Sequence, residues 1–293
     1  MKKTSLYYLV GIIASILACY INNSSAQTDN KGKSLLWSIN SKNLRTPSYL
    51  FGTIHLICPE DYVWTNAMAQ SLQKSEEICL ELDMDDEGMT MEIALGMLDK
   101  SGKKLSEYFT AEEYARLKQI IADSTGMDIA QFEPMKPVVL QSILTSLLAN
   151  CKNPVSYEAN ISDLAKKEQK EVSGLETPSQ QLEMFDNLVA DSVVKAINET
   201  VNDINKQRAE YNKLIQLYKK QDLPKLHALI QESKDIDLSG FLDNRNKQWI
   251  ESMVEKMEQH SIFFAVGAGH LWGENGLINL LRKEGYIVTP ILK

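Results

Sequence analysis

A run of five apolar residues near the end of the chain, Ile262-Phe263-Phe264-Ala265-Val266, constrains the fold more than any other segment. A strand that is apolar at every position has both faces covered, which is typical of inner strands in a parallel sheet flanked by helices. Alternating or short apolar runs bounded by turn residues predict more strands. These further strands are expected at about residues 35–39, 48–51, 77–83, 171–176 and 286–288.

Most of the sequence between these predicted strands has helical periodicity. Helices are expected at about residues 60–74, 111–125, 136–149, 161–167, 178–220, 223–230, 241–258 and 277–284. Thr110 followed by Glu113 forms a capping-box pattern, and Gly126 marks the end of that helix. The pattern predicts an α/β fold whose central sheet is built from βα units at the N- and C-terminal ends, with a large helical insertion or cap at about 88–165 and 178–258.

The first residues have the order of a secretory signal. Met1-Lys2-Lys3 is positive, an apolar stretch runs from Leu6 to about Cys19, and Ser24-Ser25-Ala26 precedes Gln27. We therefore expect a signal peptide over residues 1–26 and one exported domain over 27–293, in the periplasm or secreted. An uncleaved anchor and a lipoprotein anchored at Cys19 are the alternatives.

The chain is acidic, with 39 acidic against 31 basic residues and a formal net charge of −8. No basic stripe interrupts this excess, so a nucleic-acid-binding role is not expected. Nothing beyond the leader is apolar for long enough to span a membrane. A peptide or a small molecule is the expected substrate, and the oligomeric state is left open.

Three cysteines follow the predicted leader. Cys79 lies in the apolar run Ile78-Cys79-Leu80, where a free thiol behaves as a small hydrophobic group. Cys58 and Cys151 each lie close to a proline in loop-like sequence. If a disulfide forms in an oxidising compartment, we expect Cys58–Cys151.

Two Gly-x-x-His turns are the strongest indication of a functional site. Gly52-Thr53-Ile54-His55 and Gly267-Ala268-Gly269-His270 each begin where a predicted strand ends. The carboxyl ends of strands face the crevice in which α/β folds bind ligands, and glycine permits close backbone approach or positive φ there. We expect both imidazoles on one rim, although a single such histidine would more often only satisfy buried carbonyl groups.

Carboxylates could complete a metal site or an acid–base pair with these histidines. Glu81 is the preferred candidate because an acid within an otherwise apolar strand needs a partner. Asp83 shares its alternation but also fits a solvated loop. Glu176 ends another predicted strand, and Arg245 suits a bidentate clamp on a carboxylate. His227 and His260 fit packing or surface roles.

Serine-hydrolase elbows, phosphate-binding glycine loops and His-Glu-x-x-His helices are absent from the sequence. Several segments together resemble the TraB/GumN family, which is grouped with the Tiki proteases and with erythromycin-esterase and ChaN-like folds. The matching segments, in family order, are Tyr49–Leu56, Glu81 in its strand, Gly174–Thr177, Arg245-Asn246 and Val266–Leu271.

The resemblance implies an α/β core and, in the Tiki branch, a divalent-metal-dependent protease. It implies His55, Glu81 and His270 as metal ligands or catalytic groups, with Glu176 and Arg245 in support. The metal would be manganese, cobalt or zinc. Because one fold hosts several functions, a non-catalytic protein that binds a peptide or a cofactor such as haem is the alternative.

Overall fold

The computed structural model describes residues 32–232 and 238–292, so the expected signal peptide over residues 1–26 lies outside the described residues. Its strands are β1 (Leu36–Asn40), β2 (Ser48–Thr53), β3 (Glu77–Leu80), β4 (Glu171–Gly174), β5 (Ile262–Gly267) and β6 (Ile287–Pro290). They form one sheet in the order β4-β3-β5-β2-β1-β6. The four strands from β4 to β2 are parallel, whereas β1 runs antiparallel to both β2 and β6.

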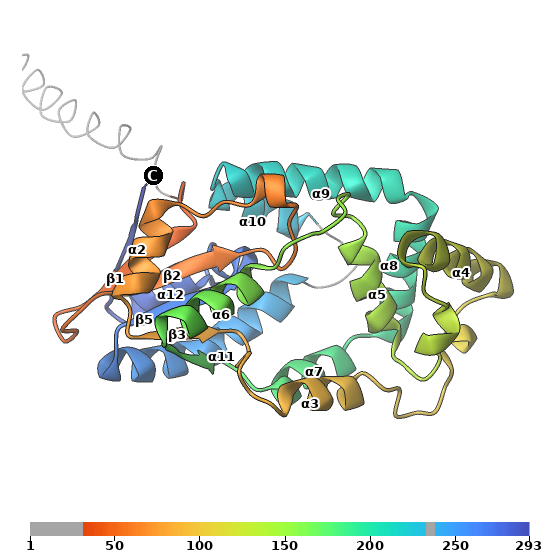
Figure 1. Cartoon of the computed structure of the whole chain (residues 1–293), viewed down its shortest axis with the longest axis horizontal. Coiled ribbons are helices and arrows are strands. Elements are labelled where there is room, and N and C mark those ends of the chain that lie inside the picture. Colours follow the sequence, from red (N-terminus) through yellow and green to blue (C-terminus); the bar gives the residue numbers. More distant parts are fainter. Residues whose placement is uncertain (1–31, 233–237, 293) are drawn as a thin grey trace, which may run out of the picture.

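Helices cover the sheet and extend beyond it (Figure 1). Those that contribute buried residues to the core around the sheet are α2 (Asn66–Lys74), α6 (Tyr157–Glu168), α9 (Ile204–Lys219), α10 (Leu223–Gln231), α11 (Leu238–Gln259) and α12 (Leu277–Lys283). As the apolar run predicts, every residue from Ile262 to Val266 in β5 is buried. The α/β fold expected from the sequence is confirmed.

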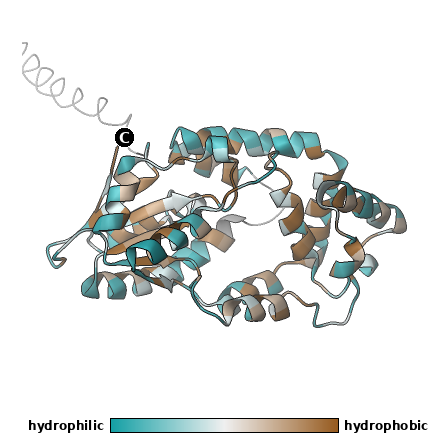
Figure 2. Cartoon of the chain, in the orientation of Figure 1, coloured by the Kyte–Doolittle hydropathy of each residue, from teal (hydrophilic) through white to brown (hydrophobic). Residues whose placement is uncertain are grey.

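A second hydrophobic core lies away from the sheet. It is formed by α4 (Ala111–Thr125), α5 (Pro137–Ser146) and α8 (Ala190–Asn202) with two short 3-10 turns, at residues 105–108 and 129–132. The long helix α9 runs between the two parts on one side, and α3 (Met89–Gly96) and α7 (Pro178–Asp186) lie on the other (Figure 1). Hydrophobic residues gather on the strands and on α5, whereas hydrophobic and hydrophilic residues alternate along α9 (Figure 2). Thus α6, α9, α10 and α11, although expected within the helical insertion, pack on the sheet.

Several predicted boundaries were wrong. The helix expected over 60–74 begins only at Asn66, because a 3-10 turn at Pro59–Asp61 is followed by extended residues up to Thr65. The long helical region expected over 178–220 consists of three helices, and Asp203 caps the last of them by accepting a hydrogen bond from the Lys206 backbone N–H. Among the described residues, no helix combines the length and apolarity needed to cross a membrane.

The expected disulfide is present. Cys58 and Cys151 are joined across 93 residues of sequence, while Cys79 is a buried free thiol whose pKa burial raises to about 12. Next to the bridge, Ile57 and Val155 exchange two backbone hydrogen bonds. The segment after His55 is therefore fastened to the segment before α6.

Candidate active site

The two Gly-x-x-His turns leave adjacent parallel strands at the same edge of the sheet. In the register of β2 and β5, Gly52 pairs with Val266 and Thr53 pairs with Gly267. A Cβ at Gly52 would lie 3.1 Å from the Cα of Ala268, and one at Gly267 would lie 3.3 Å from Oε1 of Glu81. Close approach, rather than a positive φ, is therefore the reason for glycine at both positions.

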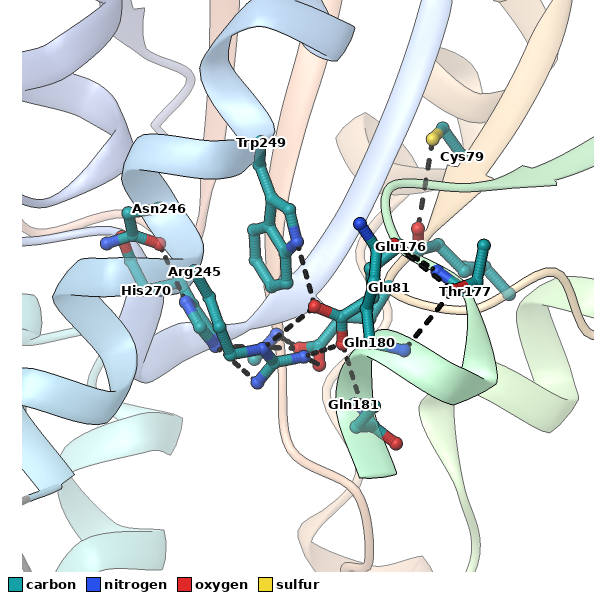
Figure 3. Close-up of polar contacts among 12 residues, drawn as sticks. Cys79, Glu81, Glu176, Thr177, Gln180, Gln181, Arg245, Asn246, Trp249 and His270 are labelled. Carbon is teal, nitrogen blue, oxygen red and sulfur yellow. Dashed lines mark hydrogen bonds and ion pairs between the residues drawn. The ribbon is translucent and has the colours of Figure 1, made fainter. Parts of the chain in front are cut away.

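A buried arginine holds the centre of the site (Figure 3). Nη2 of Arg245 on α11 donates to Glu81 Oε2 at 2.5 Å and to Glu176 Oε1 at 2.6 Å, and its Nε donates to Glu176 Oε2 at 3.2 Å. The three residues are 4%, 7% and 8% exposed. Trp249 donates from Nε1 to Glu176 Oε2 at 3.0 Å, and the guanidinium carbon lies 4.5 Å from its ring centroid. Charge-assisted bonds of this kind fix both carboxylates.

The protonation of His270 follows from its neighbour Asn246. The Asn246 side-chain amide donates to the carbonyl oxygens of His270, at 3.1 Å, and Asn275, at 2.8 Å. Its Oδ1 must then accept from Nδ1 of His270, 2.7 Å away. The Nε2 lone pair of the ring therefore points toward Arg245 Nη1, at 3.1 Å, with Glu81 Oε1 at 3.9 Å.

Charge at the site is divided between ionised carboxylates and a neutral imidazole. Burial lowers the pKa of His270 to about 3, so the ring is neutral at pH 7. Burial by itself would raise the pKa of Glu81, but the positive charges of Arg245 and His55 and the Gly267 N–H hold it below its ordinary value. Because His270 is itself neutral, Arg245 is the main counter-charge. Glu81 is therefore an anion at every pH near neutrality.

His55 has the opposite environment. Its side chain is 73% exposed, and Nδ1 lies 3.3 Å from Oε1 of Glu158 at the start of α6. Glu158 also accepts from Thr53 Oγ1 at 2.7 Å and from Ser156 Oγ at 2.9 Å. The hydrogen bond to Glu158 raises the pKa of His55 to about 9, against the effect of desolvation. At neutral pH this imidazole is a cation.

The residues present do not fit a bound divalent metal in this arrangement. Within residues 32–232 and 238–292, no three His, Cys, Asp or Glu side chains are placed to hold a metal ion. Arg245 contacts Glu81 and the Nε2 of His270, and His55 is paired with Glu158. The donor atoms of Glu81 and His270 thus face a guanidinium, which supplies the positive charge there.

The sequence-based candidates therefore divide into two groups. Glu81, Glu176, Arg245 and His270 meet in one hydrogen-bonded cluster, whereas His55 contacts Glu158 instead. Glu81 was expected inside a strand and Glu176 at the end of one, but both follow the ends of β3 and β4, where the Glu176 N–H donates to the carbonyl oxygen of Glu81 at 3.0 Å. Their side chains are consequently free to turn toward α11.

Sequence reasoning missed three side chains that complete the site. Asn246 was only noted beside Arg245, although an amide next to a clamp arginine could have suggested a ring-orienting role. Trp249, one helical turn after Arg245, had a detectable i,i+4 spacing. No local sequence pattern indicated Glu158, because its contact with Thr53 joins residues 105 positions apart.

The remaining histidines lie outside this cluster. His227 is half-buried, and its ring lies against Gly273, where a Cβ would come within 2.7 Å of it. His260 is exposed and pairs with Glu76 at 3.0 Å. Both agree with packing and surface roles. The half-buried side chain of Asp83 accepts a local turn hydrogen bond from the Asp85 N–H, as a loop residue does.

Comparison with curated proteins finds relatives of one kind. Metalloprotease TIKI2 of Danio rerio is 24% identical over 318 aligned positions, which cover 88% of this chain and 61% of the relative. Metalloprotease TIKI1 of Homo sapiens is 22% identical over 314 positions, with coverages of 87% and 61%. The chain thus spans about three fifths of the length of these relatives.

The alignment with another animal relative covers a larger share of both chains. The metalloprotease TIKI homolog of Nematostella vectensis is 23% identical over 343 positions, covering 95% of this chain and 72% of that protein. No solved structure matches the chain. The model of the TraB/PrgY/gumN family matches residues 35–290, which is nearly all of the described fold. The chain belongs to the TraB/PrgY/gumN family.

Proposed function

We propose that this chain is an exported hydrolase that cleaves peptide bonds at the edge of the sheet where the two Gly-x-x-His turns meet. The observation that carries the proposal is the buried, neutral imidazole of His270, whose Nε2 lone pair faces the guanidinium of Arg245. The names of the metalloprotease relatives supply the substrate class. A general base beside a fixed positive charge is the pair that amide hydrolysis requires.

In the proposed reaction, His270 Nε2 takes a proton from a water molecule, whose oxygen bonds to the carbonyl carbon of the peptide. The negative charge that develops on the carbonyl oxygen is stabilised by Arg245, which Glu81 and Glu176 hold in place. Asn246 keeps the other proton of His270 on Nδ1. The orientation and protonation of the base are thus set before substrate arrives.

His55 completes the proposed cycle as the acid. Its imidazolium, maintained by Glu158, gives a proton to the leaving amine as the carbon–nitrogen bond breaks. His270 then returns its extra proton to solvent, and His55 regains one from solvent. Two imidazoles whose pKa values are displaced in opposite directions are suited to these two roles.

The relatives' name also implies a divalent metal, for which manganese, cobalt and zinc are the proposed identities. Its ligands would be His55, Glu81 and His270. Binding would require Arg245 to release Glu81 and His270, so no step above depends on a metal. When bound, such an ion would supply Lewis-acid polarisation of the carbonyl group.

The test is turnover of a peptide library by protein purified without chelator, with elemental analysis of the same sample. We expect cleavage that His270→Ala abolishes and His227→Ala preserves. Cleavage lost on chelation, together with one metal ion per chain, would establish the metal-bound arrangement. A folded, exported chain that cleaves no peptide in either state would refute the proposal.

Export is proposed from the leader sequence. We propose that the mature chain begins at Gln27. The intact mass of the processed protein decides this, because a mass that retains residues 1–26 or a lipid on Cys19 is inconsistent with cleavage after Ala26.

A further inference from the structure

A hollow of about 670 Å³ lies between α7 and α11, next to the Arg245 cluster. Gln180, Glu183 and Met184 line it from one face of α7, and Asn187 and Leu188 continue that face beyond the helix end. Their spacing of three or four residues places them in one row along a helix. The hollow is therefore a groove that follows a helix face, and its volume is within the usual range for ligand sites.

The opposite wall comes from α11. Phe241, Asn244 and Gln248 lie at helical spacing on one face of that helix, and Lys247 lies beside them. A different face of α7 packs on α3, since Leu182 fills the space over Gly96 and Ser179 is hydrogen-bonded to Glu92. The groove-facing side of α7 is thus not the side that α3 covers.

The lining combines two kinds of side chain. Met184, Leu188 and Phe241 are half-buried, whereas Asn187, Asn244 and other polar residues of the lining are exposed. Within residues 32–232 and 238–292, no hydrogen bond or ion pair holds the side chains of Asn187 and Asn244. Side-chain amides of this kind donate and accept at once, as peptide groups do.

The groove lies next to the proposed reaction site. The ring of Phe241 forms part of its wall, and the guanidinium carbon of Arg245 lies 5.5 Å from the centroid of that ring. Gln180 also lines a neighbouring hollow of about 310 Å³ whose wall includes Glu176. A ligand in the groove would therefore lie beside the arginine–carboxylate cluster, with the ring of Phe241 between them.

From this geometry we infer that the α7–α11 groove binds an extended peptide next to the bond to be cleaved. The half-buried residues Met184, Leu188 and Phe241 accept an apolar side chain of leucine size. Asn187 and Asn244 hydrogen-bond the peptide groups on either side of it. The inference rests on the proposed peptidase function and adds a preference for one apolar residue in a polar, extended segment.

The test is binding, measured separately from turnover. A fluorescein-labelled decapeptide of glycine and serine with one central leucine is titrated with the full chain carrying His270→Gln, and fluorescence anisotropy is recorded. We expect the leucine peptide to bind at least about tenfold more tightly than the same peptide with serine at the centre, because a buried leucine side chain contributes about 1.5–3 kcal/mol. Met184→Trp, which fills the groove, should weaken leucine-peptide binding at least about tenfold.

Met91→Trp is the matched control, because Met91 on α3 is 65% exposed and does not line the groove. The same two substitutions in the chain with native His270 give a second measurement if His270→Gln does not fold. The inference would be overturned if Met184→Trp and Met91→Trp weakened peptide binding equally. It would also be overturned if the leucine and serine peptides bound with equal affinity. Peptide binding in the groove by a native chain without any turnover would instead count against the peptidase proposal alone.

Discussion

The two Gly-x-x-His turns have the same motif on adjacent parallel strands, yet their histidines differ in almost every physical property. His270 is 2% exposed, neutral and held by Asn246, with its pKa lowered to about 3. His55 is exposed and paired with Glu158, with its pKa raised to about 9. The local sequence sets where each turn lies, whereas burial sets the charge of His270 and the distant partner Glu158 sets the charge of His55.

This difference gives the two turns separate chemical roles. A neutral ring with an unprotonated nitrogen accepts protons, and a cationic ring donates them. Opposite displacement of two pKa values assigns a base and an acid within one site. Each cause of the difference between the two turns can be removed by substitution.

The largest effect is expected from removing the base. His270→Ala should lower kcat/KM on a cleaved peptide by about 10²–10⁴, the usual contribution of a positioned general base. His55→Ala should reduce it less and should remove the alkaline fall of the pH–rate profile that the pKa of about 9 produces. Steady-state kinetics across pH measures both effects.

The double variant tests whether the two turns act as one unit. His55→Ala with His270→Ala should be no slower than His270→Ala alone, because the losses of cooperating groups do not add. His227→Ala is the control and should leave kcat/KM unchanged. Losses that multiply in the double variant would mean that the two histidines work independently.

Arg245 keeps the His270 side of the site intact, so its removal should be the largest change in stability. Arg245→Met leaves the buried carboxylates of Glu81 and Glu176 without a counter-charge. Breaking a buried ion pair in this way costs about 3–5 kcal/mol. Urea denaturation should show this loss in the free energy of unfolding.

Arg116→Met is the matched control, because Arg116 is exposed and paired only at the surface with Glu112 and Asn202. Its free energy of unfolding should change by no more than about 0.5 kcal/mol. Adding Glu176→Gln to Arg245→Met should recover part of the loss. Equal effects of the two arginine substitutions would mean that Arg245 is not the counter-charge of the cluster.

The His55 side depends on the disulfide instead. Replacing Cys58 and Cys151 with serine releases a loop of 93 residues and should lower the free energy of unfolding by about 2–5 kcal/mol. It should also lower the pKa of His55, because the segment carrying Glu158 is no longer fastened beside it. Denaturation and histidine NMR titration measure the two effects, and a His55 pKa that does not move would separate the bridge from the turn.

Much of this fold was predictable because local signals agree with it. The apolar run at Ile262–Val266 predicted a strand covered on both faces, and Thr110 and Gly126 marked the two ends of α4 as observed. The start expected at residue 60 was wrong because apolar residues continue through 62–64, which precede the Thr65 cap. Periodicity identified the element, and the capping side chain set its first residue.

Only those site residues that follow the ends of predicted strands could be predicted from the sequence. His270 and Glu81 follow strands in the sequence, and parallel register places such residues at one edge. The contact between Arg245 and Glu81 joins residues 164 positions apart (245 − 81). The pair His55–Glu158 joins residues 103 positions apart (158 − 55). No local pattern encodes these contacts, since they arise when α11 and α6 pack against the sheet.

The smallest effect should come from Glu158→Gln, which removes only the charge that holds the proton on His55. The pKa of His55 should fall from about 9 toward its ordinary value of 6.5, because the hydrogen bond to the carboxylate is its largest cause. A raised pKa stabilises the fold fully below pH 6.5, and this stabilisation is lost as the pH rises through about 9. Glu158→Gln should therefore flatten the stability profile between those two values.

His270 provides the internal control for the same titration. Its lowered pKa stabilises the fold above pH 6.5, and that contribution is lost as the pH falls toward about 3. Glu158→Gln should leave the pKa of His270 unchanged, because Glu158 pairs with the other turn. Histidine NMR titration and urea denaturation across pH measure both windows. A shift of both histidines, or of neither, would show that the two turns are not set separately by their distant partners.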